Sequence, residues 1–127
     1  CAAFHNNIFP TIKSKLINTG ILRFEMRPFP LDGLALYAHA LVRSVPEKKY
    51  FPLVKMLLAQ HSAWVRAEDP FSALMKIARL AGVSAGEFNA IMQNRELLEA
   101  IVAVKQKGVD DWRITSTPSF VVNNNKV

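Results

Sequence analysis

The stretch STPSFVVNN, residues 116–124, does most to indicate the fold. Its second half holds a short run of apolar and β-branched residues, SFVVN at 119–123, which is typical of a strand. Directly before that run stands Thr117-Pro118, and an X-Pro bond adopts the cis form at little cost. We expect a cis bond here; the alternative is a proline that simply begins a strand. The asparagines that follow are turn residues, so Val127 can begin a partner strand.

The chain before this stretch has mostly helical periodicity. Apolar residues recur every three or four positions, and the expected helices cover 2–19, 32–45, 48–66, 70–81, 84–92 and 94–107. Aspartate, serine or asparagine precedes four of them as a cap, and Ser84 with Glu87 fits a capping box. Pro10 is expected to kink the first helix, because proline cannot donate the backbone hydrogen bond. Gly20 and Gly108 are expected to end helices.

One other segment departs from the helical pattern. In ILRFEMR, residues 21–27, apolar and charged side chains alternate, which predicts a strand with one buried face. Two isolated strands do not make a stable sheet, so the strands predicted here need partners that the 127 residues do not supply. The pattern is that of an excerpt from an α/β domain.

Composition narrows the classes of function. The chain has 127 residues, a net charge of +6 and a single cysteine, which excludes an internal disulfide and a multi-cysteine metal site. No spacing of histidines and carboxylates suits a metal, and no cofactor is expected. No apolar run spans a membrane, and no signal peptide is present in the sequence. The basic residues are spread out, so a solvated basic surface is favoured over binding to nucleic acid.

The lone cysteine, Cys1, stands at the start of the first predicted helix. The positive end of a helix favours a thiolate, which makes this thiol a candidate nucleophile or leaving group. A small buried apolar residue is the alternative. His5 follows one turn later, where it either tunes the thiol from the second layer of residues around it or lies on the helix surface.

Three segments together resemble the disulfide-bond-forming (DsbA-like) oxidoreductases of bacteria. They are CAAFHNNIFP at 1–10, RFEMRPFPLDGLALYAHAL at 23–41, and STPSFVVNN near the other end of the chain. The resemblance implies an α/β class: a thioredoxin-like fold with a helical insertion, incomplete at both ends of this sequence. Residues 1–31 and 113–127 would form the thioredoxin-like part, and 32–112 the insertion.

The resemblance also implies an activity. Cys1 matches the second cysteine of a Cys-x-x-Cys, which is the buried, resolving one, and the attacking cysteine would lie three residues upstream. Cys1 would be catalytic, and Thr117 and Pro118 would bind substrate. His5 would tune the thiol of Cys1 without contacting the substrate. Such a protein exchanges disulfides in unfolded or newly exported proteins of the bacterial periplasm, and a membrane partner reoxidises it.

Other functions stay open beside this one. Disulfide isomerases and reductases share these elements, and the direction of electron flow depends on the two residues between the cysteines. A non-catalytic module on the same fold would use the groove beside Thr117 and Pro118 to hold extended peptides. A basic helical domain that binds nucleic acid is a third reading, for which salt-sensitive affinity would be the mark.

Overall fold

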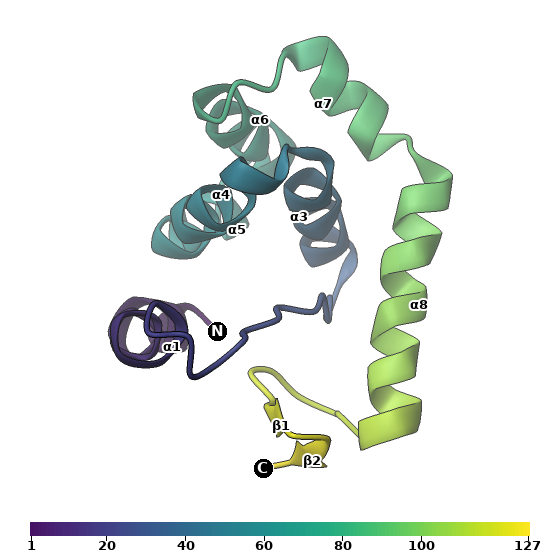
Figure 1. Ribbon diagram of the computed structural model, residues 1–127. Helices are drawn as coiled ribbons and strands as arrows, with labels where there is room; N and C mark the ends of the chain where they lie inside the picture. The colour runs from purple at the N-terminus through teal and green to yellow at the C-terminus, as the bar shows by residue number, and fades with distance from the viewer.

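The computed structural model describes residues 1–127, which form helices and one short β-hairpin (Figure 1). In chain order the elements are α1 (Ala2–Asn7), α2 (Phe9–Ile12), the π-helix η1 (Lys13–Ile17), α3 (Gly33–Ser44), α4 (Glu47–Ala59), α5 (His61–Val65), α6 (Pro70–Leu80), α7 (Ala85–Met92), α8 (Arg95–Trp112), β1 (Val121–Val122) and β2 (Asn125–Lys126). Helices α3 to α7 gather at one end of the molecule and α8 runs along its side (Figure 1). The N-terminal helices and the hairpin lie at the other end (Figure 1). None of these helices combines the length and the apolar character that a membrane span requires.

The predicted first helix is interrupted where the sequence indicates. Ile8 separates α1 from α2, and Pro10 occupies the first turn of α2. Because Pro10 has no N–H to bond the carbonyl one turn before it, the break at this point follows from the proline as predicted. Gly20 ends the helical region with a φ of 79°, a left-handed conformation that glycine adopts without strain.

The strand predicted over 21–27 is wrong as secondary structure. This segment contains no regular element, yet Leu22, Phe24 and Met26 are half-buried while the residues between them are exposed. The alternation of side chains therefore holds, and only the hydrogen-bonded ladder is missing. Within this chain no other strand lies beside the segment to pair with it, and a strand needs that partner.

The predicted caps are confirmed. Side chains accept hydrogen bonds from the first turn of their helices at Asp32 for α3, Asp69 for α6, Ser84 for α7 and Asn94 for α8. The capping box is complete: the Glu87 N–H donates to Ser84 Oγ at 3.1 Å, and the Ser84 N–H donates to Glu87 Oε2 at 2.9 Å. Local sequence alone thus places the start of each of these helices.

The helix predicted over 48–66 is instead two helices that meet at Gln60. The carbonyl of Leu57 accepts a hydrogen bond of 2.8 Å from Nε1 of Trp64. In an unbroken helix that carbonyl would accept from the backbone N–H of His61, four residues on. Trp64 is 5 % exposed, so its indole N–H needs a partner inside the protein, and the chain turns at Gln60 to supply it.

The end of α8 also differs from the prediction. The helix continues through Gly108 to Trp112, and the left-handed residue that ends it is Arg113, with a φ of 52°. Phe29 and Ile114 pack beside Gly108, where a Cβ would lie at an ordinary contact distance of 3.7 Å from both side chains. Glycine weakens a helix interior without necessarily ending it, so a glycine alone does not mark the end of a helix.

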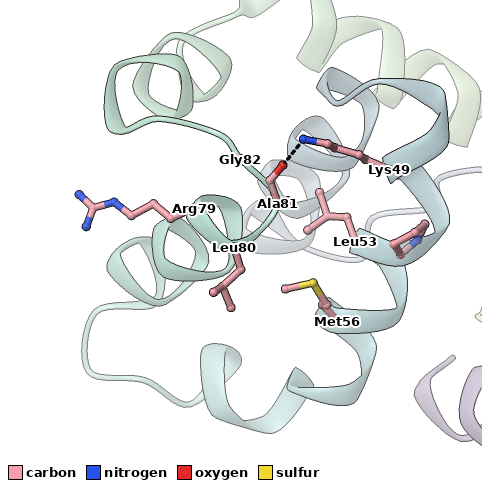
Figure 2. Close-up of a pocket in the computed structure, with 8 residues that line it drawn as sticks. Lys49, Leu53, Met56, Arg79, Leu80, Ala81 and Gly82 are labelled. Carbon is pink, nitrogen blue, oxygen red and sulfur yellow. Dashed lines mark hydrogen bonds between the residues drawn. The ribbon is translucent and has the colours of Figure 1, made fainter.

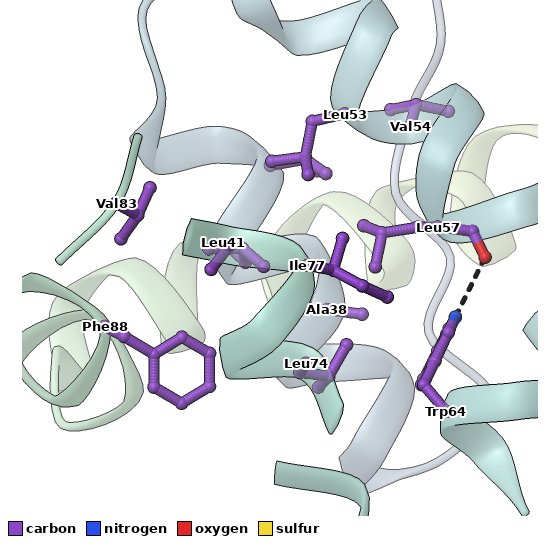
Figure 3. Packing of buried hydrophobic residues seen from close by; sticks show 12 residues of the cluster. Ala38, Leu41, Leu53, Val54, Leu57, Trp64, Leu74, Ile77, Val83 and Phe88 are labelled. Atoms are coloured by element: carbon purple, nitrogen blue, oxygen red, sulfur yellow. Dashed lines mark hydrogen bonds between the residues drawn. The ribbon is translucent and has the colours of Figure 1, made fainter. Parts of the chain in front are cut away.

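The hydrophobic core lies among α3 to α7. Twelve buried residues form it, and all of them fall between positions 38 and 88. Leu41 and Leu74 are fully buried at its centre, with Leu53 and Phe88 close to them (Figure 3). This core lies wholly within the predicted insertion, 32–112, whose boundaries remain a prediction.

The C-terminal hairpin is confirmed, but its second strand is Asn125–Lys126, within the predicted turn, and Val127 lies outside both strands. The strands are antiparallel, and Val121 pairs with Lys126 while Val122 pairs with Asn125. Asn123 and Asn124 form the turn between them, with φ values of 48° and 64°. Two successive left-handed residues make the tight turn that suits the twist of a hairpin, and asparagine tolerates that conformation better than most residues.

Candidate functional site

Cys1 occupies the cap position of α1, and its side chain is a free, exposed thiol. Its carbonyl accepts a hydrogen bond of 2.9 Å from the His5 N–H, which closes the first turn of the helix. This turn places the Cys1 sulfur at the start of α1.

The two ends of the chain meet through a pair of aromatic rings. Phe4, one turn after Cys1, lies with its ring centroid 4.8 Å from that of Phe120, at an angle of 56°. Phe120 follows Pro118 by two residues. The structure thus brings the Cys1 end of α1 and the loop before β1 to the same side of the molecule, and Figure 1 shows the N-terminus beside that loop.

The loop between α8 and β1 contains Thr117 and Pro118, and the peptide bond between them is cis. Thr117 is half-buried and Pro118 is exposed. The backbone N–H and carbonyl of Thr117 make no hydrogen bond with the rest of the chain. An unpaired backbone segment at the surface is able to pair with an extended peptide.

Side chains hold this loop at both ends. Ser119 donates from its hydroxyl to the carbonyl of Ser116 at 2.6 Å. Lys126, on β2, donates from Nζ to the carbonyl of Arg113 at 2.9 Å. The Ser119–Ser116 bond spans Thr117 and Pro118, and Lys126 ties the hairpin to the end of α8, while the backbone of Thr117 itself makes no hydrogen bond.

His5 lies on α1 with its ring nearly parallel to that of Phe9, at 5.2 Å between centroids. Partial burial lowers the pKa of His5 from its ordinary value, and the nearby positive charge of Lys55 lowers the pKa further. The imidazole is therefore neutral at physiological pH. A neutral ring one turn from Cys1 can accept a proton, whereas a charged one could not.

A cluster of aromatic rings beside the site was not predicted from the sequence. It consists of Phe4, Phe9, Phe24, Phe51 and Phe120. Phe9 lies at its centre, 4.9 Å from Phe24 and 6.2 Å from Phe51 between ring centroids. None of the five is fully buried, and Phe51 is 40 % exposed. They come from four different segments, so periodicity within one segment gives no signal for the cluster.

The structure contains no group of three histidine, cysteine, aspartate or glutamate side chains placed to hold a metal. The histidine with the most strongly shifted pKa is His39, on α3. Burial and the positive charge of Arg43, one turn later, lower the pKa of His39 to about 4. His39 thus stays uncharged in the folded protein far below the pH at which a solvated histidine titrates.

Comparison with known sequences gives a match over the whole chain. Residues 1–127 match the family described as "Thioredoxin". A protein of Rickettsia typhi named "Putative protein-disulfide oxidoreductase" is 27% identical over 124 residues, covering 97% of this chain and 46% of that protein. A protein of the same name from Rickettsia conorii is 28% identical, with 97% and 45% covered. The chain spans about half the length of these curated relatives.

Solved structures give the same result. Alpha-DsbA1 of Wolbachia pipientis has a TM-score of 0.86 and 31% sequence identity, with 95% of this chain and 62% of that chain covered. The protein-disulfide isomerase of Novosphingobium aromaticivorans has a TM-score of 0.77 at 14% identity, covering 100% of this chain and 76% of that one, which is a likeness of fold alone. The predicted thioredoxin-like fold is confirmed.

Proposed function

Because the chain belongs to the thioredoxin family, and within it to the DsbA-like group, we propose that its natural protein is a thiol-disulfide oxidoreductase. One observation carries the proposal beyond family membership. Cys1 and the unpaired backbone of Thr117 come from opposite ends of the chain, and the contact of Phe4 with Phe120 brings those two ends together. A redox-active cysteine pair close to a strand-like binding edge suits exchange with an extended protein substrate.

The chemistry uses Cys1 with the attacking cysteine three residues before it in the natural protein. In the oxidising direction, a substrate thiolate attacks the sulfur of that upstream cysteine, and Cys1 leaves as a thiolate. A second thiolate of the substrate then attacks the substrate sulfur of this mixed disulfide, and the upstream cysteine of the enzyme leaves as a thiolate. The substrate gains a disulfide and the enzyme is left with two thiols. Two electrons pass from substrate to enzyme, and reduction of a substrate runs the same steps backwards.

The other site residues support this exchange. Thr117 offers its free N–H and carbonyl to the substrate backbone, and Pro118 sets the direction of the loop that carries them. The half-exposed aromatic cluster receives apolar side chains, which unfolded proteins expose. We propose that His5, one helical turn from Cys1 and stacked on Phe9, acts through Cys1 as a neutral imidazole.

The likeness to the DsbA-like group also supports a proposal for the compartment, the substrates and the partner. We propose unfolded or newly exported proteins of the bacterial periplasm as substrates, and a membrane partner that reoxidises the enzyme. We also propose that residues 1–31 and 113–127 carry the redox site while 32–112, which holds the buried core, forms a separate helical insertion.

The test is to trap the intermediate in the full-length protein. With the upstream attacking cysteine intact, Cys1→Ser removes the thiol that competes for the mixed disulfide, so substrate proteins should accumulate covalently on the enzyme. Bands on a non-reducing gel that disappear on reduction, with the partners identified by mass, would support the proposal. A variant that lacks both cysteines is the matched control. An absence of trapped partners in an oxidising extract would count against thiol exchange.

A non-catalytic peptide-binding module is the second candidate. The free backbone of Thr117 favours it, because that backbone could hold a peptide without any thiol. Binding of an unfolded polypeptide that is the same in Cys1→Ser and wild-type protein, together with a failure to trap, would favour this function over the first.

A further inference from the structure

Two hollows lie side by side on the helical part of the molecule. The larger, of about 350 Å³, opens between α4 and the end of α6 (Figure 2). The smaller, of about 220 Å³, opens between α5 and α6. Leu80, the last residue of α6, lines both of them. We call the two hollows with Leu80 between them the Leu80 face.

The floor of the Leu80 face is apolar. Leu53 and Met56 of α4 line the larger hollow, and Trp64 and Ile77 line the smaller. Leu80 itself is 73 % exposed, while Leu74 and Ile77 of the same helix are buried. A single exposed leucine is ordinary on a protein surface, but a leucine between two apolar hollows forms a surface suited to other side chains.

The charges at this face all have one sign. Lys49, Lys76 and Arg79 are the only charged residues that line the hollows. None of the three forms an ion pair within the chain. Lys49 donates from Nζ to the carbonyl of Ala81 at 2.9 Å, which holds its charge at the rim (Figure 2). Figure 2 shows Arg79 reaching from α6 into solvent at the opposite side. An apolar floor with an unpaired basic rim is complementary to an acidic, apolar ligand.

We propose that the Leu80 face binds an extended acidic segment of a partner protein. Apolar side chains of that segment fill the hollows on either side of Leu80, and its carboxylates pair with Lys49, Lys76 and Arg79. The hollows favour a polypeptide over an anionic membrane, because a membrane surface binds apolar side chains that protrude, whereas here the protein offers recesses.

The Leu80 face is separate from the site that contains Cys1. Helix α4 divides the two: it presents Phe51 to the aromatic cluster, while Leu53 and Met56 line the larger hollow. The end of α6 also lies at the far end of the molecule from the hairpin (Figure 1). A partner bound at Leu80 therefore leaves the thiol site open. This binding goes beyond thiol exchange and does not depend on it.

The test is a binding titration of the full-length protein with a fluorescently labelled peptide, Glu-Leu-Asp-Phe-Glu, read by anisotropy. We expect saturable binding that weakens about tenfold in Arg79→Glu and in Leu80→Ser, through lost charge pairing and lost apolar contact. Both side chains are exposed, so the variants should melt like the wild type. Arg95→Glu, on α8, is the matched charge control and should bind like the wild type. Cys1→Ser should also leave binding unchanged, which separates this result from any failure of thiol exchange.

Three results would overturn the proposal. The first is equal binding of the wild type to the peptide Lys-Leu-Lys-Phe-Lys, which would show that the charges play no part. The second is an equal loss of affinity in Arg95→Glu, which would indicate a response to net charge alone. The third is binding to phosphatidylglycerol vesicles, sensitive to Arg79→Glu, without binding to the acidic peptide, which would identify a membrane as the occupant.

Discussion

The burial of His39 predicts a specific loss of stability in mild acid. Burial and the charge of Arg43 hold the pKa of His39 at about 4, against an ordinary value of 6.5. In the unfolded chain His39 takes up a proton as the pH falls through 6.5, while in the folded protein it stays neutral until about pH 4. Between these values the unfolded state binds more protons, so the free energy of unfolding falls as the pH falls. This contribution is fully present above pH 6.5 and is lost as the pH drops to about 4.

The size of the effect follows from the shift. One pKa unit corresponds to about 1.4 kcal/mol, so a shift from 6.5 to about 4 amounts to at most about 3.5 kcal/mol. Because the ring of His39 is partly exposed, the true value lies below that limit. Even about 2 kcal/mol is a large share of the stability of a domain this size.

The assay compares wild type with His39→Gln by urea unfolding at several pH values from about 8 to about 4. The difference in unfolding free energy between the two proteins should change by about 2–3 kcal/mol across this range, with the wild type losing more. His5 and the carboxylates titrate in both proteins, so their contributions cancel in the difference. Parallel pH profiles for the two proteins would refute the reasoning, whatever their absolute stabilities.

Three further predictions concern stability and are measured by the same urea unfolding at neutral pH. Trp64→Phe should cost about 1–3 kcal/mol, because the Leu57 carbonyl loses its buried donor; a loss no larger than that of an exposed substitution would contradict the account of the break after α4. Gly82→Ala should cost about 1–2 kcal/mol, because its φ is 84° and a Cβ would come within 2.9 Å of Lys49 Nζ; an unchanged midpoint would argue against this backbone. Leu74→Ala should lower the free energy of unfolding by about 2–5 kcal/mol, because Leu74 is fully buried. Leu80→Ala is the exposed control from the same helix and should change it by no more than about 0.5 kcal/mol. Equal losses in the two variants would contradict the assignment of Leu74 to the core.

The sequence predicts well those features that local chemistry determines. Ser84 and Glu87 complete each other across one turn, and Asn123 with Asn124 suits a tight turn whatever surrounds it. The same holds for the interruption at Pro10, since a missing N–H is a property of the residue itself.

Features that depend on distant partners are not predictable in this way. The alternation over 21–27 gives the buried side of the segment, but a strand also needs a neighbouring strand. Helix α8 continues through Gly108 and ends at Arg113, so the glycine does not by itself set the end of the helix. The indole of Trp64 divides a helix by bonding to a carbonyl seven residues earlier, which competes with the helical pattern.

The candidate site also combines features that the local sequence predicts with features that only packing creates. Cys1 and Thr117-Pro118 stand out in the sequence because each has a distinctive local chemistry. Their proximity rests on the contact between Phe4 and Phe120, which are separated by most of the chain. The aromatic cluster and the Leu80 face are likewise products of packing among segments, so only the structure shows them.

The central claim is that Cys1 is one half of a redox-active cysteine pair. The most direct measurement is the intact mass of the full-length natural protein after thiol alkylation, with and without prior reduction, followed by mapping of the modified residues. We predict that reduction makes two thiols available, one at Cys1 and one three residues before it. Modification of Cys1 alone, equal with and without reduction, would contradict dithiol chemistry.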